Sequence, residues 1–224
     1  MTQVLTITLN PAIDQTIPVQ KLIPGEVHRA TGHSSTPGGK GIGVSIILAS
    51  LGVRTTATGW LGADNDSLFV QAFERNGIKD AMVRLPGSTR TNVKIVDNEA
   101  GESTDVNLPG IKLDAGEQAK DELILAERIE ALARPGDWCE FGGSLPPGIT
   151  VDIWLRLAKR LLNKGVHIVI DVAGSRLGQI LKPCCLLYPS TPATEGHRVG
   201  PGVARFTTKK QKRPPNNTQH TENH

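Results

Sequence analysis

The nine residues Ser35-Thr36-Pro37-Gly38-Gly39-Lys40-Gly41-Ile42-Gly43 concentrate glycine directly ahead of an apolar run at residues 44–51. This order predicts a loop that leads into the first turn of a helix. Glycine lets backbone N–H groups approach a ligand closely, and a helix start presents unpaired N–H donors with a partial positive charge. The stretch therefore suits a sugar hydroxyl or an anion, and the alternative is a tight turn that only joins a strand to a helix.

The chain up to residue 183 alternates between strand and helix patterns, which is typical of βαβ units around a mostly parallel sheet. The predicted strands are residues 4–9, 55–60, 79–85, 137–141 and 167–171, and the predicted helices are residues 42–50, 64–75, 114–133, 154–162 and 175–181. Asp64-Asn65 is the predicted cap of the second helix. Asp114 with Glu117 resembles a capping box that opens the third.

Two segments interrupt this alternation. Residues 12–35 read as short extended pieces broken by Pro24-Gly25. Residues 90–96 alternate with period two, which places Arg90 and Lys94 on one side of a strand, and a turn at 97–101 leads into a partner strand. Two cations on one face favour an anionic ligand, and the alternative is an exposed edge hairpin whose charges are solvated.

Three features follow predicted strand ends, where ligands gather in parallel sheets. Asp14 comes just after the first strand, the Gly-Gly-Lys-Gly turn precedes the first helix, and residues 142–148 form a second loop rich in glycine and proline. Their convergence predicts a binding site, although a solvated turn residue is the alternative for Asp14. Lys40 is followed by Gly41 and not by Ser or Thr, so this is not a Walker-type phosphate loop.

Composition separates the chain into two parts. Of the 224 residues 38% are hydrophobic and 4% are aromatic, which predicts that some of the chain contributes nothing to a core. Residues 184–224 show no apolar period and carry several prolines, so we expect disorder there. The net charge of +3 is concentrated in this tail, and its basic run at 209–213 is weak evidence for nucleic acid or an address signal.

The sequence gives no signal for secretion or a membrane. Cys139, Cys184 and Cys185 are too few and wrongly spaced for a disulfide framework or a zinc site, which suits a reducing compartment. No window approaches the roughly 20 apolar residues of a membrane span. We therefore expect a cytoplasmic protein with neither a nucleic-acid nor a membrane partner.

In combination and in this order, the motifs closely resemble the ribokinase-like sugar kinases of the phosphofructokinase B type, in the branch that contains 1-phosphofructokinase and tagatose-6-phosphate kinase. The resemblance covers residues 1–183. The matching segments are Thr8-Leu9-Asn10-Pro11-Ala12-Ile13-Asp14, Pro37-Gly38-Gly39-Lys40-Gly41-Ile42, Leu51-Gly52, Gly59-Trp60-Leu61-Gly62, Thr89-Arg90-Thr91-Asn92-Val93-Lys94 and Gly143-Ser144-Leu145-Pro146-Pro147-Gly148.

The resemblance implies an α/β three-layer sandwich with a small β-lid, formed by residues 12–35 and 89–108. It implies a kinase that uses ATP with Mg²⁺ to phosphorylate the 6-hydroxyl of fructose 1-phosphate or a related hexose phosphate, with a homodimer formed through the lid. The implied substrate-binding residues are Asp14 for sugar hydroxyls, Gly38, Gly39 and Lys40 for the sugar, Arg90 for the existing phosphate, Ser144 as a pocket wall, and Arg29. The resemblance assigns no metal ligand within this sequence.

The sequence departs from the family at two places. Gly43 stands where members usually carry asparagine, which bears on substrate preference. Lys182-Pro183 is followed by Cys184-Cys185, and no later Gly-Ala-Gly-Asp segment supplies the catalytic base and anion hole. Residues 184–224 thus resemble a non-family tail in place of the C-terminal ATP half. We expect this chain to be inactive, and the alternative is a non-catalytic sugar-phosphate-binding fragment or a misfolded remnant.

Overall fold

A five-stranded, fully parallel sheet forms the centre of the computed structural model, which describes residues 2–114 and 116–171. Its strand order is β5-β4-β1-β8-β9. The strands are β1 (Val4–Thr8), β4 (Thr55–Gly62), β5 (Lys79–Leu85), β8 (Trp138–Gly142) and β9 (His167–Asp171). All five follow the sequence-based prediction to within two residues at each end.

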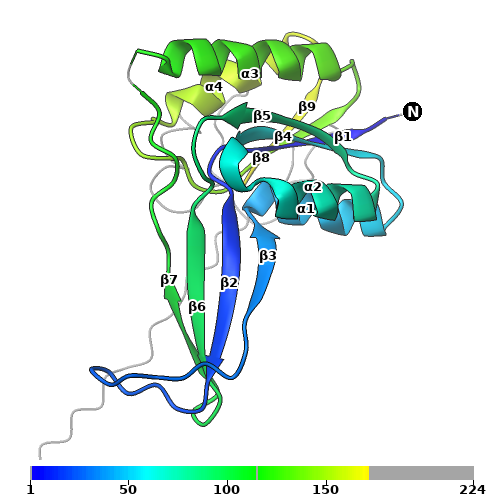
Figure 1. Cartoon of the computed structure of the whole chain (residues 1–224). Coiled ribbons are helices and arrows are strands. Elements are labelled where there is room, and N and C mark those ends of the chain that lie inside the picture. The colour runs from blue at the N-terminus through cyan, green and yellow to red at the C-terminus, as the bar shows by residue number, and fades with distance from the viewer. Residues whose placement is uncertain (1, 115, 172–224) are drawn as a thin grey trace, which may run out of the picture.

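Helices cover both faces of this sheet (Figure 1). The helices α1 (Lys40–Ser50) and α2 (Ser67–Asn76) lie on one face, and α3 (Gln118–Leu132) and α4 (Asp152–Leu162) lie on the other. A short 3₁₀ turn, η1 (Ala63–Asn65), precedes α2. The predicted three-layer α/β sandwich is therefore confirmed.

The two faces of the sheet bury separate cores because successive strand residues point to opposite sides. Trp60 packs in the core that α3 and α4 cover, whereas the next residue, Leu61, packs in the core that α1 and α2 cover. The first core also holds Phe141 and Trp154, whose rings meet edge to face at a centroid distance of 5.3 Å. The buried side of α4 is made of apolar residues at helical spacing, namely Ile153, Trp154, Leu157, Ala158 and Leu161, whereas Leu162 is 40% exposed.

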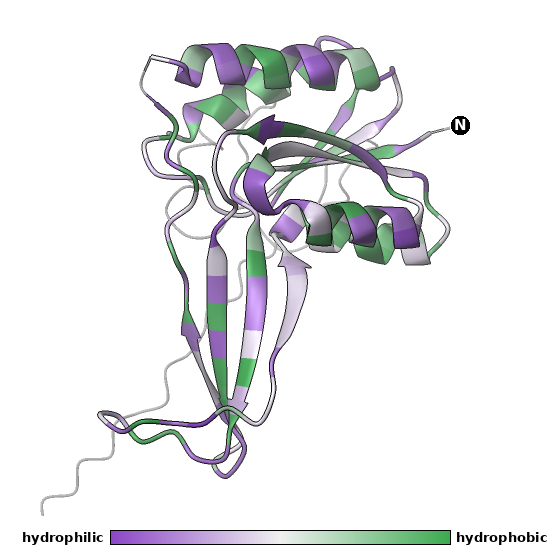
Figure 2. Cartoon of the chain, viewed as in Figure 1, coloured by the Kyte–Doolittle hydropathy of each residue, from purple (hydrophilic) through white to green (hydrophobic). Residues whose placement is uncertain are grey.

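A second sheet projects from the body as the predicted lid (Figure 1). Its order is β3-β2-β6-β7, with strands β2 (Ala12–Val19), β3 (Ser34–Gly38), β6 (Thr91–Asp97) and β7 (Glu102–Val106). The strands β2 and β6 are parallel, and both outer pairs are antiparallel. Hydrophobic and hydrophilic residues alternate along β6 (Figure 2), as the period-two pattern predicts.

Both predicted helix caps are wrong, and the structure shows why. The helix α3 begins only at Gln118, because the N–H groups of Glu117 and Gln118 bond the carbonyl oxygen of Asp114 while no side chain caps the helix. Asn65 precedes the start of α2 and instead bonds the backbone N–H and C=O of Thr89, at 2.8 and 2.9 Å. Asn65 therefore bonds a residue that is distant in the sequence and does not cap α2.

Two sequence-based expectations, the helix at residues 175–181 and the disorder of residues 184–224, lie outside the described residues.

Candidate functional site

The carboxyl-terminal edge of the central sheet and the base of the lid meet at one place. Asn10 follows β1, Gly143 follows β8, and Asp171 ends β9, while α1 begins at Lys40 against the same edge. The backbone N–H of Gly143 donates to the carbonyl oxygen of Asp171 at 3.3 Å. The structure therefore brings the three features predicted from strand ends into one region, which we call the carboxyl-edge site.

Asp14 lies on β2 at the base of the lid and is exposed. Its Oδ1 accepts a hydrogen bond from Asn92 Nδ2 at 2.9 Å, across the parallel pair of β2 and β6. Its Oδ2 lies directly over Gly38, where an added Cβ would stand only 2.1 Å away. Glycine at position 38 thus makes room for this carboxylate, which keeps one oxygen available to a ligand.

Gly39 ends the loop before α1 with a φ of 125°, a conformation that side chains disfavour. A Cβ there would also stand 2.9 Å from Thr8 Cγ2, so the loop packs tightly on the end of β1. The predicted loop and helix start are both confirmed, with α1 beginning two residues earlier than expected.

Lys40 directs its ammonium toward the end of β9. Its Nζ forms an ion pair with Asp171 Oδ1 at 2.7 Å and donates to the Asp171 carbonyl oxygen at 3.3 Å. Both side chains are about half exposed, so the pair is screened by solvent and contributes little to stability. Asp171 was not among the residues that the sequence singled out, because its pairing with Lys40 depends on the fold.

Arg90 is engaged by backbone carbonyl groups. Its Nε donates to Pro11 O at 3.2 Å, one terminal nitrogen donates to Leu108 O at 2.8 Å, and the other to Asn10 O at 3.2 Å. Burial lowers the pKa of Arg90, and the nearby carboxylate of Asp14 opposes that shift. Three of the five guanidinium N–H groups are used, so one remains on each terminal nitrogen.

Ser144 contacts Asn10, the second residue after β1. Its Oγ accepts a hydrogen bond from Asn10 Nδ2 at 3.0 Å, and the same amide donates to Leu145 O at 3.3 Å. Asn10 therefore ties the second glycine-rich loop to the strand that leads into the lid. This linking role of Asn10 was not predicted.

Two cations of the predicted site lie elsewhere. Arg29 is exposed in the loop between β2 and β3, at the end of the lid far from the central sheet (Figure 1). Lys94 forms an ion pair with Asp105 at 2.7 Å across the β6–β7 hairpin. The expected cationic face of β6 is thus occupied by internal partners, and Arg29 lies apart from Asp14 and Lys40.

Glu140 is the residue that sequence reasoning missed. It lies on β8 beneath the site and is 6% exposed, and neither carboxyl oxygen has a hydrogen-bond partner among the described residues. Burial raises its pKa to about 7, repulsion by Asp171 acts in the same direction, and Lys40 opposes them. In the sequence, Glu140 is a polar residue between Cys139 and Phe141. Nothing in that pattern indicates that its side chain is buried.

Glycine is required next to this carboxyl group. A Cβ on Gly41 would stand 2.6 Å from Thr8 Oγ1 and 3.0 Å from Glu140 Oε2. Thr8 Oγ1 is likewise buried without a partner in the described part of the chain. The first turn of α1 thus lies directly over a buried acid whose pKa is raised to about 7.

No metal centre is evident in residues 2–114 and 116–171, because they contain no group of three or more His, Cys, Asp or Glu side chains that could hold an ion. Within the same ranges, none of the helices combines the length and apolar character that a membrane span needs.

Comparison with known proteins gives a consistent result. Residues 1–191 match the model of the pfkB family carbohydrate kinases. The chain is 39% identical over 210 residues to a 1-phosphofructokinase of Xanthomonas campestris pv. campestris, covering 90% of this chain and 65% of the relative. It is 40% identical over 179 residues to a 1-phosphofructokinase of Rhodobacter capsulatus, covering 80% of this chain and 56% of the relative.

A solved structure shows the same fold. It is phosphofructokinase-2 from Escherichia coli in complex with fructose-6-phosphate, with a TM-score of 0.73 and 26% identity, and the match covers 81% of this chain and 58% of that one. The chain thus spans about three fifths of the length of the proteins it matches.

The buried carboxyl group of Glu140 predicts a pH dependence of stability. The folded protein holds this group neutral up to about pH 7, whereas the unfolded chain ionises it near its usual pKa of 4.5. The free energy of unfolding should therefore fall between pH 4.5 and 7, by about 3 kcal/mol from this group, and stay level above.

Glu140→Gln cannot ionise and should remove that fall, as measured by urea unfolding at pH 5 and pH 8. Glu74→Gln, an exposed change on α2, is the control and should leave the pH dependence as in the unmodified chain. An unchanged pH dependence in Glu140→Gln would show that Glu140 is not buried neutral.

Proposed function

The chain belongs to the pfkB family of carbohydrate kinases, and from this premise we propose that its carboxyl-edge site binds fructose 1-phosphate or a related hexose phosphate. The observation that carries the proposal is the arrangement of Asp14 and Arg90 at the base of the lid. Among the described residues, one carboxylate oxygen of Asp14 on β2 and two guanidinium N–H groups of Arg90, just before β6, have no hydrogen-bond partner. Carboxylates accept sugar hydroxyls and guanidinium groups bind phosphate with two parallel hydrogen bonds.

Each of the remaining residues has a role in this proposal. Gly38 leaves the space that Asp14 occupies, and Gly39 presents the start of α1 to the sugar. Lys40 keeps one ammonium N–H beyond the two bonds to Asp171, and Ser144 forms the wall next to Asn10. Arg29 enters only if the far end of the lid folds over the sugar.

We propose that the family reaction of this protein is the conversion of fructose 1-phosphate to fructose 1,6-bisphosphate, in which ATP supplies the γ-phosphoryl group and leaves as ADP, and Mg²⁺ would neutralise the phosphate charge. In kinase sites Mg²⁺ is bound by one or two carboxylates together with the substrate phosphates, and no group of three or more His, Cys, Asp or Glu side chains that could hold an ion lies among the described residues. The sequence also carries no Gly-Ala-Gly-Asp segment after residue 183. We therefore assign the described residues to the sugar phosphate and propose that a polypeptide of these 224 residues binds it without turnover.

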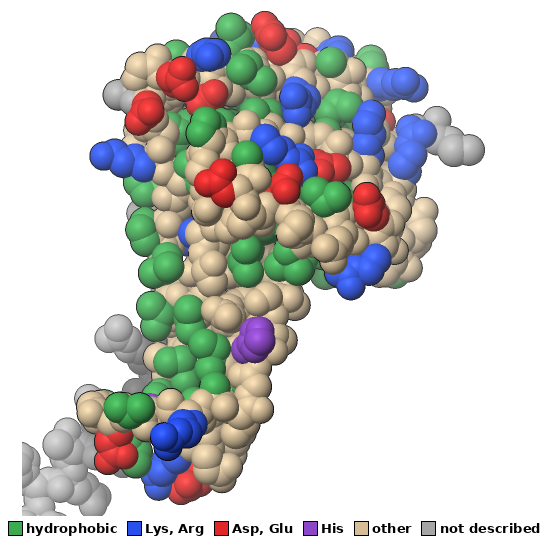
Figure 3. All heavy atoms as spheres, viewed as in Figure 1, with side chains coloured by type: hydrophobic (Ala, Val, Ile, Leu, Met, Phe, Trp, Pro, Cys, Tyr) green, Lys and Arg blue, Asp and Glu red, His purple; other side chains and the backbone are tan. Residues whose placement is uncertain are grey.

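The remaining parts of the proposal concern assembly, extent and location. The lid carries exposed hydrophobic side chains on one face (Figure 3), with Val106 and Leu108 both 45% exposed or more, which supports a homodimer through the lid. Sedimentation equilibrium that shows only monomer would contradict the proposed homodimer.

The domain boundary at residue 183 stays a prediction, and the family match runs to residue 191. We place the protein in the cytoplasm, where sugar phosphates and ATP occur together.

Titration calorimetry with fructose 1-phosphate tests the proposed binding. Arg90→Ala should weaken binding about 10- to 100-fold, because a hydrogen bond to a charged group contributes roughly 1.5–3 kcal/mol. Arg90→Lys keeps the charge but loses the paired hydrogen bonds, so its affinity should lie between those of the unmodified chain and Arg90→Ala. Arg75→Ala, on the exposed side of α2, is the matched control. Equal affinities in all four proteins would contradict the role of Arg90.

A pair of glycine substitutions tests the role of Asp14 without touching it. Gly38→Ala places a methyl group against the Asp14 carboxylate, so fructose 1-phosphate should bind at least about tenfold more weakly. Gly43→Ala meets nothing within 4 Å and should raise helix stability without weakening binding. If Gly38→Ala binds as tightly as Gly43→Ala, the Asp14 carboxylate is not a sugar ligand.

A further inference from the structure

The buried carboxyl group of Glu140 extends toward the carboxyl-edge site. Glu140 and Gly142 lie on the same face of β8, because they are two residues apart in a strand. A Cβ added to Gly142 would stand 2.2 Å from Glu140 Oε1, so the carboxyl group leans along β8 over this glycine. In register, Gly142 lies between Thr8 of β1 and Asp171 of β9. The carboxyl group of Glu140 thus reaches the row of the sheet that holds Asp171.

Two charged groups of opposite sign act on Glu140. Burial, the largest cause, raises its pKa to about 7, the negative charge of Asp171 acts in the same direction, and the ammonium of Lys40 lowers it. Lys40 Nζ is itself paired with Asp171 Oδ1 at 2.7 Å. The three side chains therefore form one cluster, to which α1, β8 and β9 each contribute one member.

The other residues around Glu140 add no charge to this cluster near neutral pH. Its neighbours in register are Thr6 on β1 and Val169 on β9, and Thr6 Oγ1 is hydrogen-bonded to Ser45 Oγ of α1 at 2.7 Å. Cys139 precedes it on β8 but lies in the opposite core, where burial raises the pKa of the thiol well above its usual value.

A bound sugar phosphate would change the charge around Glu140 in one direction. The pair of Lys40 with Asp171 is about half exposed, so the ammonium can turn to an anionic ligand at low cost. That movement takes away the positive charge that favours the ionised form of Glu140, and the phosphate group brings further negative charge. Both effects favour the protonated carboxyl group.

Building on the proposed function, we propose that Glu140 takes up a proton from solvent when the carboxyl-edge site binds a sugar phosphate, and that Lys40 couples the two events. Glu140 is then a positioning residue that acts through Lys40. In its ionised form it helps to hold the ammonium in the cluster, and in its protonated form it releases the ammonium to the ligand.

The sign of the resulting pH dependence follows from linkage. The complex holds the proton on Glu140 more tightly than the free chain does, so the free chain loses the proton first as the pH rises. Affinity for the sugar phosphate therefore falls as the pH rises through about 7, and it becomes level once Glu140 is ionised in the complex as well.

Calorimetric titration with fructose 1-phosphate, in two buffers that differ in their heat of ionisation, tests this coupling. The unmodified chain should bind about fivefold more weakly at about pH 8.5 than at about pH 6.5, if binding raises the pKa of Glu140 by about one unit. Its heat of binding at about pH 7.5 should also differ between the buffers. Glu140→Gln should lose both effects, apart from those of the ligand's own phosphate group, and Glu74→Gln, exposed on α2, should keep both.

A titration without ligand separates this inference from the proposed function. The carbon NMR signal of the Glu140 carboxyl group, identified by its absence in Glu140→Gln, reports the pKa of that group directly. Lys40→Met should raise this pKa and Asp171→Asn should lower it, because each substitution removes one charge that acts on Glu140. Both substituted side chains are about half exposed, so neither change should prevent folding.

Two results would overturn the inference. One is an affinity for fructose 1-phosphate that varies with pH in the same way in the unmodified chain and in Glu140→Gln. The other is a pKa of Glu140 that Lys40→Met leaves unchanged. Absence of fructose 1-phosphate binding at every pH would contradict the proposed function, and the NMR titration would still decide whether Lys40 and Glu140 are coupled.

Discussion

The guanidinium group of Arg90 joins the lid to the body of the protein. Its three hydrogen bonds reach carbonyl oxygens on the chain entering β2 and on the chain leaving β7, and Arg90 itself leads into β6. Carbonyl groups outside regular structure need hydrogen-bond donors, and this planar cation donates to three of them. Thr89, the residue before Arg90, is held by Asn65 and by the N–H of Gly62. The position of Asp14 over the sheet edge depends on this joint.

Charge at the carboxyl edge is arranged around this joint in two layers. Lys40 and Asp171 form an exposed pair at the surface, and Glu140 lies buried below them. Because its pKa is raised to about 7, Glu140 carries less negative charge near pH 7 than an exposed glutamate does, which weakens its competition with Asp171 for Lys40. Because the Lys40–Asp171 pair is exposed, the proposed binding of a sugar phosphate would replace it at low cost.

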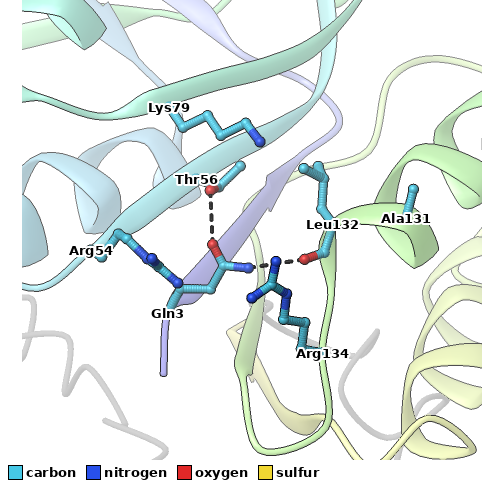
Figure 4. A pocket seen from close by; sticks show the side chains of 7 residues that line it. All are labelled: Gln3, Arg54, Thr56, Lys79, Ala131, Leu132 and Arg134. Atoms are coloured by element: carbon cyan, nitrogen blue, oxygen red, sulfur yellow. Dashed lines mark hydrogen bonds between the residues drawn. The ribbon is translucent and has the colours of Figure 1, made fainter. Parts of the chain in front are cut away.

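Sequence reasoning was most successful where the pattern is local. We could predict the alternation of strands and helices, the lid hairpin and the loop before α1. The period of the hydrophobic residues, the positions of glycine and the ends of the strands can all be read from the sequence. It failed where the contacts of a side chain are set by a partner that is distant in the sequence. Asn65 bonds Thr89 and not its own helix, and Arg90 reaches carbonyl groups on two distant segments. Gln3, Lys79 and Arg134 line one hollow (Figure 4) although no spacing rule connects them in the sequence.

The central claim is that these 224 residues provide the sugar side of a kinase and not its phosphoryl-transfer chemistry. A coupled assay with fructose 1-phosphate, ATP and Mg²⁺ tests it most directly, with the Xanthomonas campestris relative assayed in parallel. The account predicts saturable binding of fructose 1-phosphate with turnover at least about 10²- to 10⁴-fold below the relative, the usual effect of losing a general base. Turnover equal to that of the relative would contradict it.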